Sequence, residues 1–302
     1  GTTGFTAQAR GAGDNTLVVL LRALLLAGLV GVALVALHVP LRELGLWLLG
    51  GSPEVRSLAR EYIDLRVLGA PAALGNFALI GFAIGVHRTR VALKMTVLMH
   101  LANALLDVLL VQVWHFDVRG VAAASAAAEY LGLAGGLFWL RREIFGAAWR
   151  ARPRGALWQP TAMLRLLAVN RDIFVRSLAL LSVFFFFAAQ GARLGDTVLA
   201  ANAVLITFLL LLSNLLDGFA NAAEALVGEA LGGGRARDLK RAVAATGKWS
   251  AIIALAGLLG FALGGAALIR LLTDLPSVRA TAIDYLPWML LLPITASAGF
   301  WL

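Results

Sequence analysis

The sequence has no cysteine and little charge. The absence of cysteine from all 302 residues excludes disulfide bonds and thiolate metal ligands. Charged residues make up 14% of the chain, compared with about 25% in soluble domains, and 60% of the residues are hydrophobic. A soluble core cannot bury that much apolar surface. No segment alternates polar and apolar residues in the manner of a membrane β-barrel strand.

Long apolar runs dominate the sequence instead. Each approaches the roughly 20 residues that an α-helix needs to cross a bilayer. We therefore predict an all-α, polytopic membrane protein. The predicted helices cover residues 17–38, 56–85, 90–113, 119–140, 166–190, 197–229, 246–270 and 280–302.

The net charge of +9 is concentrated in alternate connections between these runs. The connections near residues 10–22, 88–94, 141–165 and 235–248 hold more than twice as many Arg and Lys as the others. Cytoplasmic loops carry such an excess, so we place these connections in the cytoplasm. No basic face interleaved with aromatic residues is present, and nucleic-acid binding is therefore not expected.

The two halves of the sequence resemble each other. "AQARGAG" at 7–13 matches "GEALGGG" at 228–234, and the segment 55–71 matches 278–293 at nearly the same separation. The pattern predicts two lobes, 1–165 (including a linker at 141–165) and 166–302. A parallel repeat of this kind is typical of transporters with a central cleft. Completed lobes would hold six helices each, so we expect a chain cut at both ends that covers about the second to the tenth helix.

Three segments resemble the multidrug and toxic compound extrusion (MATE) family, in the subfamily named for the DNA-damage-inducible protein F. They are "AQARGAGD", "YIDLRVLGAPAALGNFALIGFAIGVHRTRVAL" and "NRDIFVRSLALL…GARLGDTVLAANAVL…NLLDGFANAAEALVGEALG". The resemblance implies two six-helix lobes around a V-shaped cleft, in a bacterial inner membrane. It also implies export of organic, often cationic compounds, driven by inward flow of H⁺ or Na⁺. A carboxylate on the first helix of that family, which this chain lacks, works with the cation site.

A first set of polar residues lies in "HLANALLDVLLVQ", where His100, Asn103 and Asp107 share one helix face. Ser125 on the next, antiparallel helix is expected at a similar depth, roughly 9–12 Å below the outer surface. We therefore predict that Asn103, Asp107 and Ser125 form a site for H⁺ or Na⁺, in agreement with the family resemblance. An intramembrane carboxylate typically marks an ion path, but such residues also form packing hydrogen bonds between helices.

A second set lies on one face of the helix 197–229 and predicts the wall of a water-filled substrate cleft. Its members are Asn202, Asn214, Asp217, Asn221 and Glu224. Arg171, Asp172 and Arg176 begin the preceding helix and form either a cytoplasmic gate or a structural ion pair, with Asp172 and Arg176 spaced to pair. The sequence suggests no role for Glu129. The run "FFFF" at 184–187 is interpreted as facing lipid. A helix can bend at Gly69 and Pro71.

These features predict a secondary antiporter that exports organic compounds as a monomer in the lipid bilayer, with no cofactor other than the coupling ion. A lipid-linked saccharide flippase of the wider superfamily is the first alternative, but basic residues are expected in its cleft. A membrane-embedded lipid-modifying enzyme is the second. No Walker loop or nucleophile elbow is present to indicate catalysis.

Overall fold

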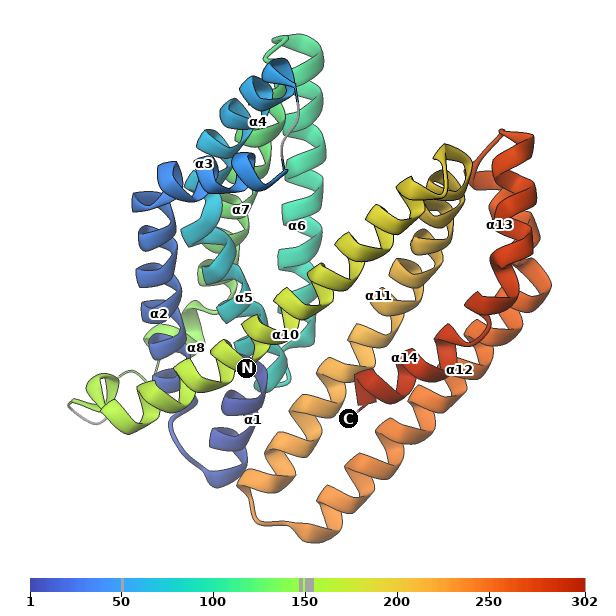
Figure 1. Ribbon diagram of the computed structural model, residues 1–302. Helices are drawn as coiled ribbons and strands as arrows, with labels where there is room; N and C mark the ends of the chain where they lie inside the picture. Colours follow the sequence, from blue (N-terminus) through green and yellow to red (C-terminus); the bar gives the residue numbers. More distant parts are fainter. Residues whose placement is uncertain (50–51, 147–148, 150–154, 302) are drawn as a thin grey trace. The chain divides into compact units, whose positions relative to one another are not determined.

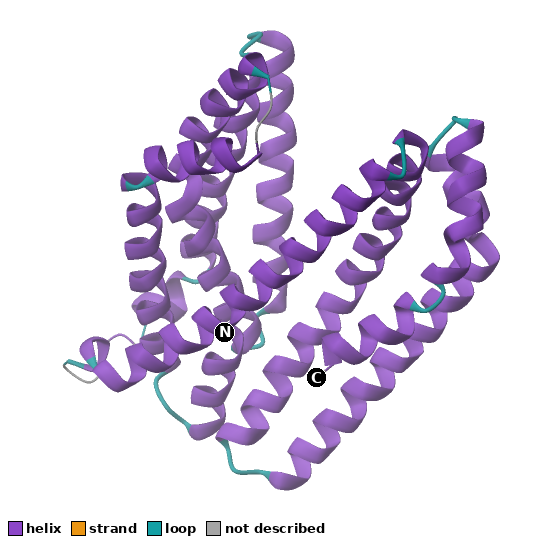
Figure 2. Ribbon diagram, viewed as in Figure 1, coloured by secondary structure: helices purple, strands orange, loops and turns teal. Residues whose placement is uncertain are grey.

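The structure is a computed structural model that describes residues 1–49, 52–146, 149 and 155–301. The described residues form helices joined by short loops, and they contain no strand (Figure 2). The helices are α1 (Thr2–Ala12), α2 (Thr16–Ala36), α3 (His38–Leu49), α4 (Pro53–Arg66), η1 (Val67–Gly69), α5 (Ala70–Gly85), α6 (Thr89–Asp107), η2 (Val108–Val113), α7 (Asp117–Trp139), α8 (Arg141–Phe145), η3 (Ala156–Trp158), α10 (Pro160–Arg193), α11 (Asp196–Gly232), α12 (Ala236–Leu272), α13 (Pro276–Met289) and α14 (Leu292–Trp301).

Seven helical stretches in the described part of the chain are long and apolar enough to cross a membrane. They correspond to the first seven predicted runs, and the all-α, multi-pass fold is confirmed. The stretches are α2, α4 to α5, α6 with η2, α7, α10, α11 and α12.

The eighth predicted run, 280–302, is not one helix, and that prediction was wrong. It is divided into α13 and α14 by a turn at Leu290 and Leu291. Proline has no backbone N–H and its ring clashes with the preceding turn of a helix, so Pro293 prevents an α-helix from continuing through this point. The chain closes tighter bonds instead, from Leu290 N–H to Pro287 O and from Leu291 N–H to Trp288 O.

The chain folds into two compact units. Unit 1 contains residues 1–166 with 232–234, and unit 2 contains residues 167–231 with 235–302. The predicted linker, 141–165, falls partly outside the described residues. Where the structure describes it, the linker contains α8 and η3.

In unit 1, α5 lies at the centre and packs against α1, α2 and α7, while α6 packs along α7 (Figure 1). Small residues permit these close approaches. On α7 the buried row repeats every four residues, as Gly120, Ala124, Ala128, Gly132 and Gly136. Interfaces of this kind let membrane helices approach each other closely. Larger apolar side chains complete the core: Leu17, Leu20, Leu79, Phe82 and Met95.

The stretch from α4 to α5 is interrupted by a turn of 3₁₀-helix, η1. Ser52 caps the start of α4 by accepting a hydrogen bond from Val55 N–H. Pro71 lacks the N–H that would bond to Val67 O in an α-helix, and Ala70 N–H bonds to that oxygen instead. The predicted bend near Gly69 and Pro71 therefore coincides with a local change of helix type.

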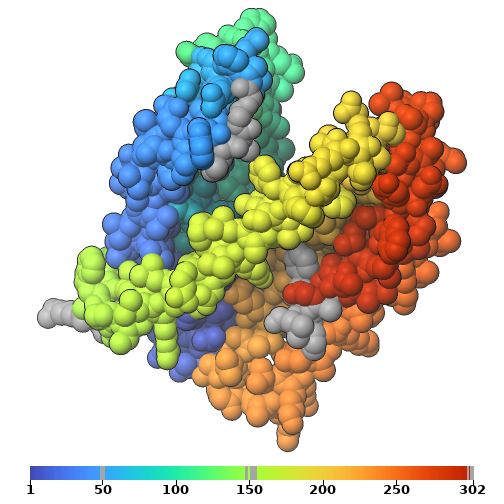
Figure 3. Space-filling model, viewed as in Figure 1, coloured from blue at the N-terminus to red at the C-terminus, as the bar shows by residue number. Residues whose placement is uncertain are grey.

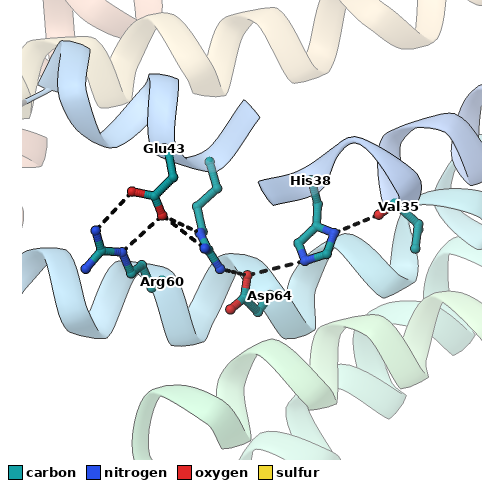
Figure 4. A network of polar contacts seen from close by, with 6 residues as sticks. Val35, His38, Glu43, Arg60 and Asp64 are labelled. Carbon is teal, nitrogen blue, oxygen red and sulfur yellow. Dashed lines mark hydrogen bonds and ion pairs between the residues drawn. The ribbon is translucent and has the colours of Figure 1, made fainter. Parts of the chain in front are cut away.

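A chain of ion pairs joins α3 to α4 (Figure 4). Glu43 accepts from Arg60 Nη2 at 2.9 Å and from Arg42 Nε at 3.0 Å, and Asp64 pairs with Arg42 and His38. The hydrogen bond from Arg60 lowers the pKa of Glu43, whereas the hydrogen bond to Asp64 raises the pKa of Arg42. Any stabilisation from the ionised Glu43 is therefore present at neutral pH and is lost as the pH falls through its lowered pKa.

Unit 2 is built around α11 and α12. Phe208 and Phe261 meet edge to face with ring centroids 5.1 Å apart, and Leu212, Leu216 and Ile269 extend this core. α13 and α14 pack against α12. The apolar side chains of α10 are largely exposed, as expected for a helix that contacts lipid, and α10 lies at the surface in the space-filling view (Figure 3).

Candidate functional site: a polar cavity in unit 1

A cavity of about 280 Å³ lies among α4, α5, α6 and α7 within unit 1. Two predicted site residues meet in its wall. Asn103 Nδ2 on α6 donates a hydrogen bond of 3.1 Å to Ser125 Oγ on α7. The antiparallel pairing of two neighbouring helices thus brings together side chains 22 residues apart, as the sequence predicts.

Asp107 is the last residue of α6 and does not line this cavity. Its Oδ1 atom is buried and has no hydrogen-bond partner among the described residues. The chain then changes to a π-helix, in which Trp114 N–H bonds to Leu109 O, five residues back. Such segments often occur at functional sites. The structure therefore pairs Asn103 with Ser125, whereas Asp107 Oδ1, one helical turn further along, has no hydrogen-bond partner in the described part of the chain.

Asn76 on α5 is a cavity residue that the sequence did not predict. Its side chain is 3% exposed, and its Nδ2 donates to Glu129 O at 2.8 Å. Its Oδ1 atom is buried without a partner in the described part of the chain. An unsatisfied buried amide oxygen is costly, so a donor or cation that reached this atom would stabilise it. The only signal in the sequence was a lone amide in an apolar run.

An ion pair between Arg66 and Glu129 closes one side of the cavity. Arg66 Nη1 donates to Glu129 Oε2 at 3.0 Å, and Nη2 donates to Oε1 at 2.6 Å. The two parallel hydrogen bonds form the fork typical of strong Arg–carboxylate pairs. Glu129, which had no assigned role, therefore has a partner 63 residues away. His100, on the predicted polar face of α6, also lines the cavity.

The second predicted set lies along α11 in unit 2. Asn214 and Asp217 are exposed, whereas Asn221 and Glu224 are half-buried. Asn221 Nδ2 donates to Asp217 O at 2.8 Å, one turn back along the same helix. Asn202 is buried, with 8% of its surface exposed, so its environment differs from that of the four residues further along α11.

Asn202 contributes to a different feature, an apolar cavity of about 520 Å³ within unit 2. Phe184 and Phe187 line the same cavity, together with Tyr285 and Trp288. Phe185 and Phe186 are 63% and 66% exposed. The phenylalanine run is therefore divided between an exposed face, as interpreted from the sequence, and the wall of this cavity.

The three residues predicted as a gate are exposed on α10. Asp172 pairs with Arg171 at 2.8 Å, and no ion pair joins it to Arg176 in the part of the chain that is described. The expected i, i+4 pairing is replaced by one between adjacent residues. Arg176 instead interacts electrostatically with Asp217 on α11. This interaction connects the predicted gate with the predicted cleft residues.

The described residues contain no cluster of three or more His, Cys, Asp or Glu side chains of the kind that holds a transition metal. The side-chain oxygen atoms around the unit 1 cavity come from two amides, a hydroxyl and one carboxylate, that of Glu129. Hard cations prefer such oxygen ligands.

Comparison with known proteins identifies the family. The MatE family model matches residues 1–109 and 173–300. The chain belongs to the MatE family. It is 38% identical to DNA damage-inducible protein F of Escherichia coli (strain K12) over 99% of this chain and 65% of that protein. It is 31% identical to Protein DETOXIFICATION 42 of Arabidopsis thaliana, over 70% of this chain and 38% of the relative.

Solved structures agree with the MatE fold. A crystal structure of MATE in complex with MaD3S has a TM-score of 0.87 at 21% identity, with 99% of this chain and 68% of that chain covered. An outward-facing multidrug resistance MATE family transporter of the MOP superfamily has a TM-score of 0.83, also at 21% identity. This MatE chain thus spans about two thirds of the length of its Escherichia coli relative.

Proposed function

We propose that the native protein containing this chain is a secondary active antiporter. It exports organic, often cationic compounds from a bacterial cell across the inner membrane, driven by inward flow of H⁺ or Na⁺. Membership of the MatE family supports export, as does the likeness to a structure described as a multidrug resistance transporter. We further propose that it acts as a monomer in lipid, without a cofactor, and has no enzymatic activity.

The observation that carries the proposal is the polar group at the end of α6. Asp107 Oδ1 is buried without a hydrogen-bond partner among the residues that the structure describes, and Asn103 one turn away is bonded to Ser125. A carboxylate oxygen shielded from water is costly, and a bound proton or cation removes that cost. We therefore assign the coupling ion to Asp107, with Asn103 and Ser125, one helical turn away, as neutral oxygen donors.

Coupling requires that the ion bind one conformation of the lobe better than another, because only a difference in affinity shifts an equilibrium. Two irregular segments border the polar group, η1 in the α4–α5 stretch and η2 after Asp107. Both are places where a change in helix geometry can follow a change at the site. Unit 2 contributes the substrate side in this proposal, through Asn214, Asp217, Asn221 and Glu224, with Arg171, Asp172 and Arg176 as the gate.

The residues assigned to the substrate side favour an antiporter over a lipid-linked saccharide flippase. Asn214, Asp217, Asn221 and Glu224 are amides and carboxylates, with no basic side chain among them. A site that recognises a phosphate-linked saccharide needs basic groups that are available to the phosphate.

The test is gradient-driven efflux of a cationic dye from liposomes that contain the native protein, with pH and Na⁺ gradients imposed separately. Asp107→Asn keeps the shape but removes the ionisable group, so we expect it to abolish efflux while the folded protein persists. Asp117→Asn is the matched control, because Asp117 is exposed and its positive φ of 44° is tolerated by Asn. If Asp107→Asn protein exports at the normal rate with unchanged ion dependence, Asp107 is a packing residue and the site assignment is wrong.

A further inference from the structure

Two adjacent residues of α7 bind the interruption between α4 and α5 from several directions. Glu129 forms the fork with Arg66, the last residue of α4, and Tyr130 OH donates to Leu68 O within η1 at 2.9 Å. Beyond the interruption, Asn76 Nδ2 donates to Glu129 O. The side chain of Glu129 therefore holds Arg66, before η1, and its backbone carbonyl holds Asn76, after η1.

The fit at η1 depends on the small size of Gly69. A β-carbon at this position would collide with Glu129 Oε2 and lie 3.0 Å from Ala126 Cα. The close approach of α7 is therefore part of the same arrangement that places the carboxylate beside the interruption.

The backbone hydrogen bonds within the α4–α5 interruption stabilise it only weakly. Pro71 removes one backbone hydrogen bond, and a 3₁₀ turn has poorer hydrogen-bond geometry than an α-helix. Side-chain exposure of 34% for Arg66 and 17% for Glu129 places the ion pair largely away from solvent. Each charge in such an environment needs the other, because an isolated charge within a membrane-spanning segment is costly.

We propose that Arg66 and Glu129 are positioning residues of the unit 1 cavity. Their ion pair holds the α4–α5 interruption against α7, and this fixes Asn76 in the wall that it shares with Asn103 and Ser125. The inference rests on the proposed function in that it assigns these residues to the coupling site. Neither residue needs to contact the coupling ion, since both act through the placement of Asn76.

The same two helices offer a matched control. Arg119 Nε on α7 donates to Glu61 Oε2 on α4 at 3.1 Å, with side chains 64% and 37% exposed. This second pair joins the same elements through the same chemistry but lies outside the cavity. Exposed pairs of this kind contribute little to stability. A general role in attaching α4 to α7 would affect both pairs, whereas a positioning role would affect only the pair at η1.

The experiment measures hydrogen exchange of the amides in residues 66–76 of the native protein, together with the half-saturating Na⁺ or H⁺ concentration for dye efflux. For Glu129→Gln we expect exchange to accelerate by about tenfold or more, because local opening becomes easier. We expect the half-saturating concentration to rise by a similar factor of about ten. Glu61→Gln should change either quantity by less than about twofold.

Two further variants distinguish the proposed positioning role from a simple loss of folding. Arg66→Lys keeps the charge but loses the fork, and it should give an intermediate acceleration. The double exchange of Arg66→Glu with Glu129→Arg should restore exchange to within about threefold of the native rate, since the pair reforms. Unchanged exchange in Glu129→Gln, or equal effects of Glu129→Gln and Glu61→Gln, would overturn the proposal. Accelerated exchange in a protein that shows no ion-driven efflux would leave the positioning intact and refute the transport function.

Discussion

Asp107 and Glu129 are carboxylates on apolar helices of the same unit, yet their environments are opposite. Glu129 receives two hydrogen bonds from Arg66, whereas Asp107 Oδ1 is buried without a partner among the described residues. A carboxylate already neutralised by a guanidinium has little need of an exchangeable ion. One that is shielded and unpaired is stabilised when a proton or cation binds. The contrast agrees with the two proposed roles, in which Asp107 carries the ion and Glu129 shapes its surroundings.

On α11, Asp217 lies near the positive charge of Arg176. Asp217→Asn would leave Arg176 without that negative neighbour, and the local potential would then repel cationic substrates. We expect efflux of a monovalent cationic dye to fall at least about fivefold more than efflux of a neutral one. Asp196→Asn, at the exposed start of the same helix, serves as the control. Equal losses for both dyes would indicate a packing role for Asp217.

The sequence correctly predicted the contact between Asn103 and Ser125, although it also placed Asp107 with them, and Asp107 does not line their cavity. Asn103 and Ser125 lie on consecutive antiparallel helices, so their depths could be estimated by counting from the connection between them. Arg66 and Glu129 are 63 residues apart and meet only because α4 packs against α7. Pairwise helix packing is a tertiary property, so the sequence could mark Glu129 as unusual without naming its partner.

At the scale of elements, Gly31 on α2 is a sensitive contact. An added β-carbon there would lie 2.5 Å from Pro71 Cα and 2.9 Å from Pro71 N. These are backbone atoms, so the strain cannot be relieved by a side-chain rotation. We expect Gly31→Ala to destabilise the protein by about 1–3 kcal/mol in thermal unfolding in detergent.

Gly28 on the same helix provides the comparison, because a β-carbon added there would have no neighbouring atom within 4 Å. Gly28→Ala should be neutral or stabilising by up to about 1 kcal/mol, as alanine is the better helix former. A similar effect of both substitutions would contradict the close packing of α2 against the α4–α5 interruption.

Apolar length located the first seven spans but not all of their boundaries, since α12 begins at Ala236, ten residues before the predicted start at 246, and it failed for the eighth run. The run 280–302 is apolar throughout most of its length, yet Pro287 and Pro293 impose local geometry that hydrophobicity does not encode. The 3₁₀ turn at Val67–Gly69 was easier to foresee, since Gly69 and Pro71 are two residues apart. The ion pairs between α3 and α4 could not be read from the sequence, because they depend on how the two helices pack (Figure 4).

At the scale of the whole molecule, the distribution of Arg and Lys predicts orientation in the membrane. The absence of cysteine from the chain makes this directly measurable, since any thiol introduced into it is unique there. We expect a membrane-impermeant maleimide to label Glu54→Cys only in right-side-out vesicles and Ala236→Cys only in inside-out vesicles. Both positions are exposed in the structure. Labelling of both from the same side would refute the predicted orientation.

The π-helix at Val108–Val113 has a consequence for how related sequences are compared. Its hydrogen bonds span five residues in place of four, so it accommodates one residue more than an α-helical segment with the same ends. Length variation of a single residue can be absorbed here without moving Asn103 or Asp107. Each residue of an α-helix turns the chain by about 100°. In a relative without the extra residue, the chain after the position of residue 113 would therefore present a different helix face. Alignment gaps between relatives belong within this segment, downstream of Asn103 and Asp107.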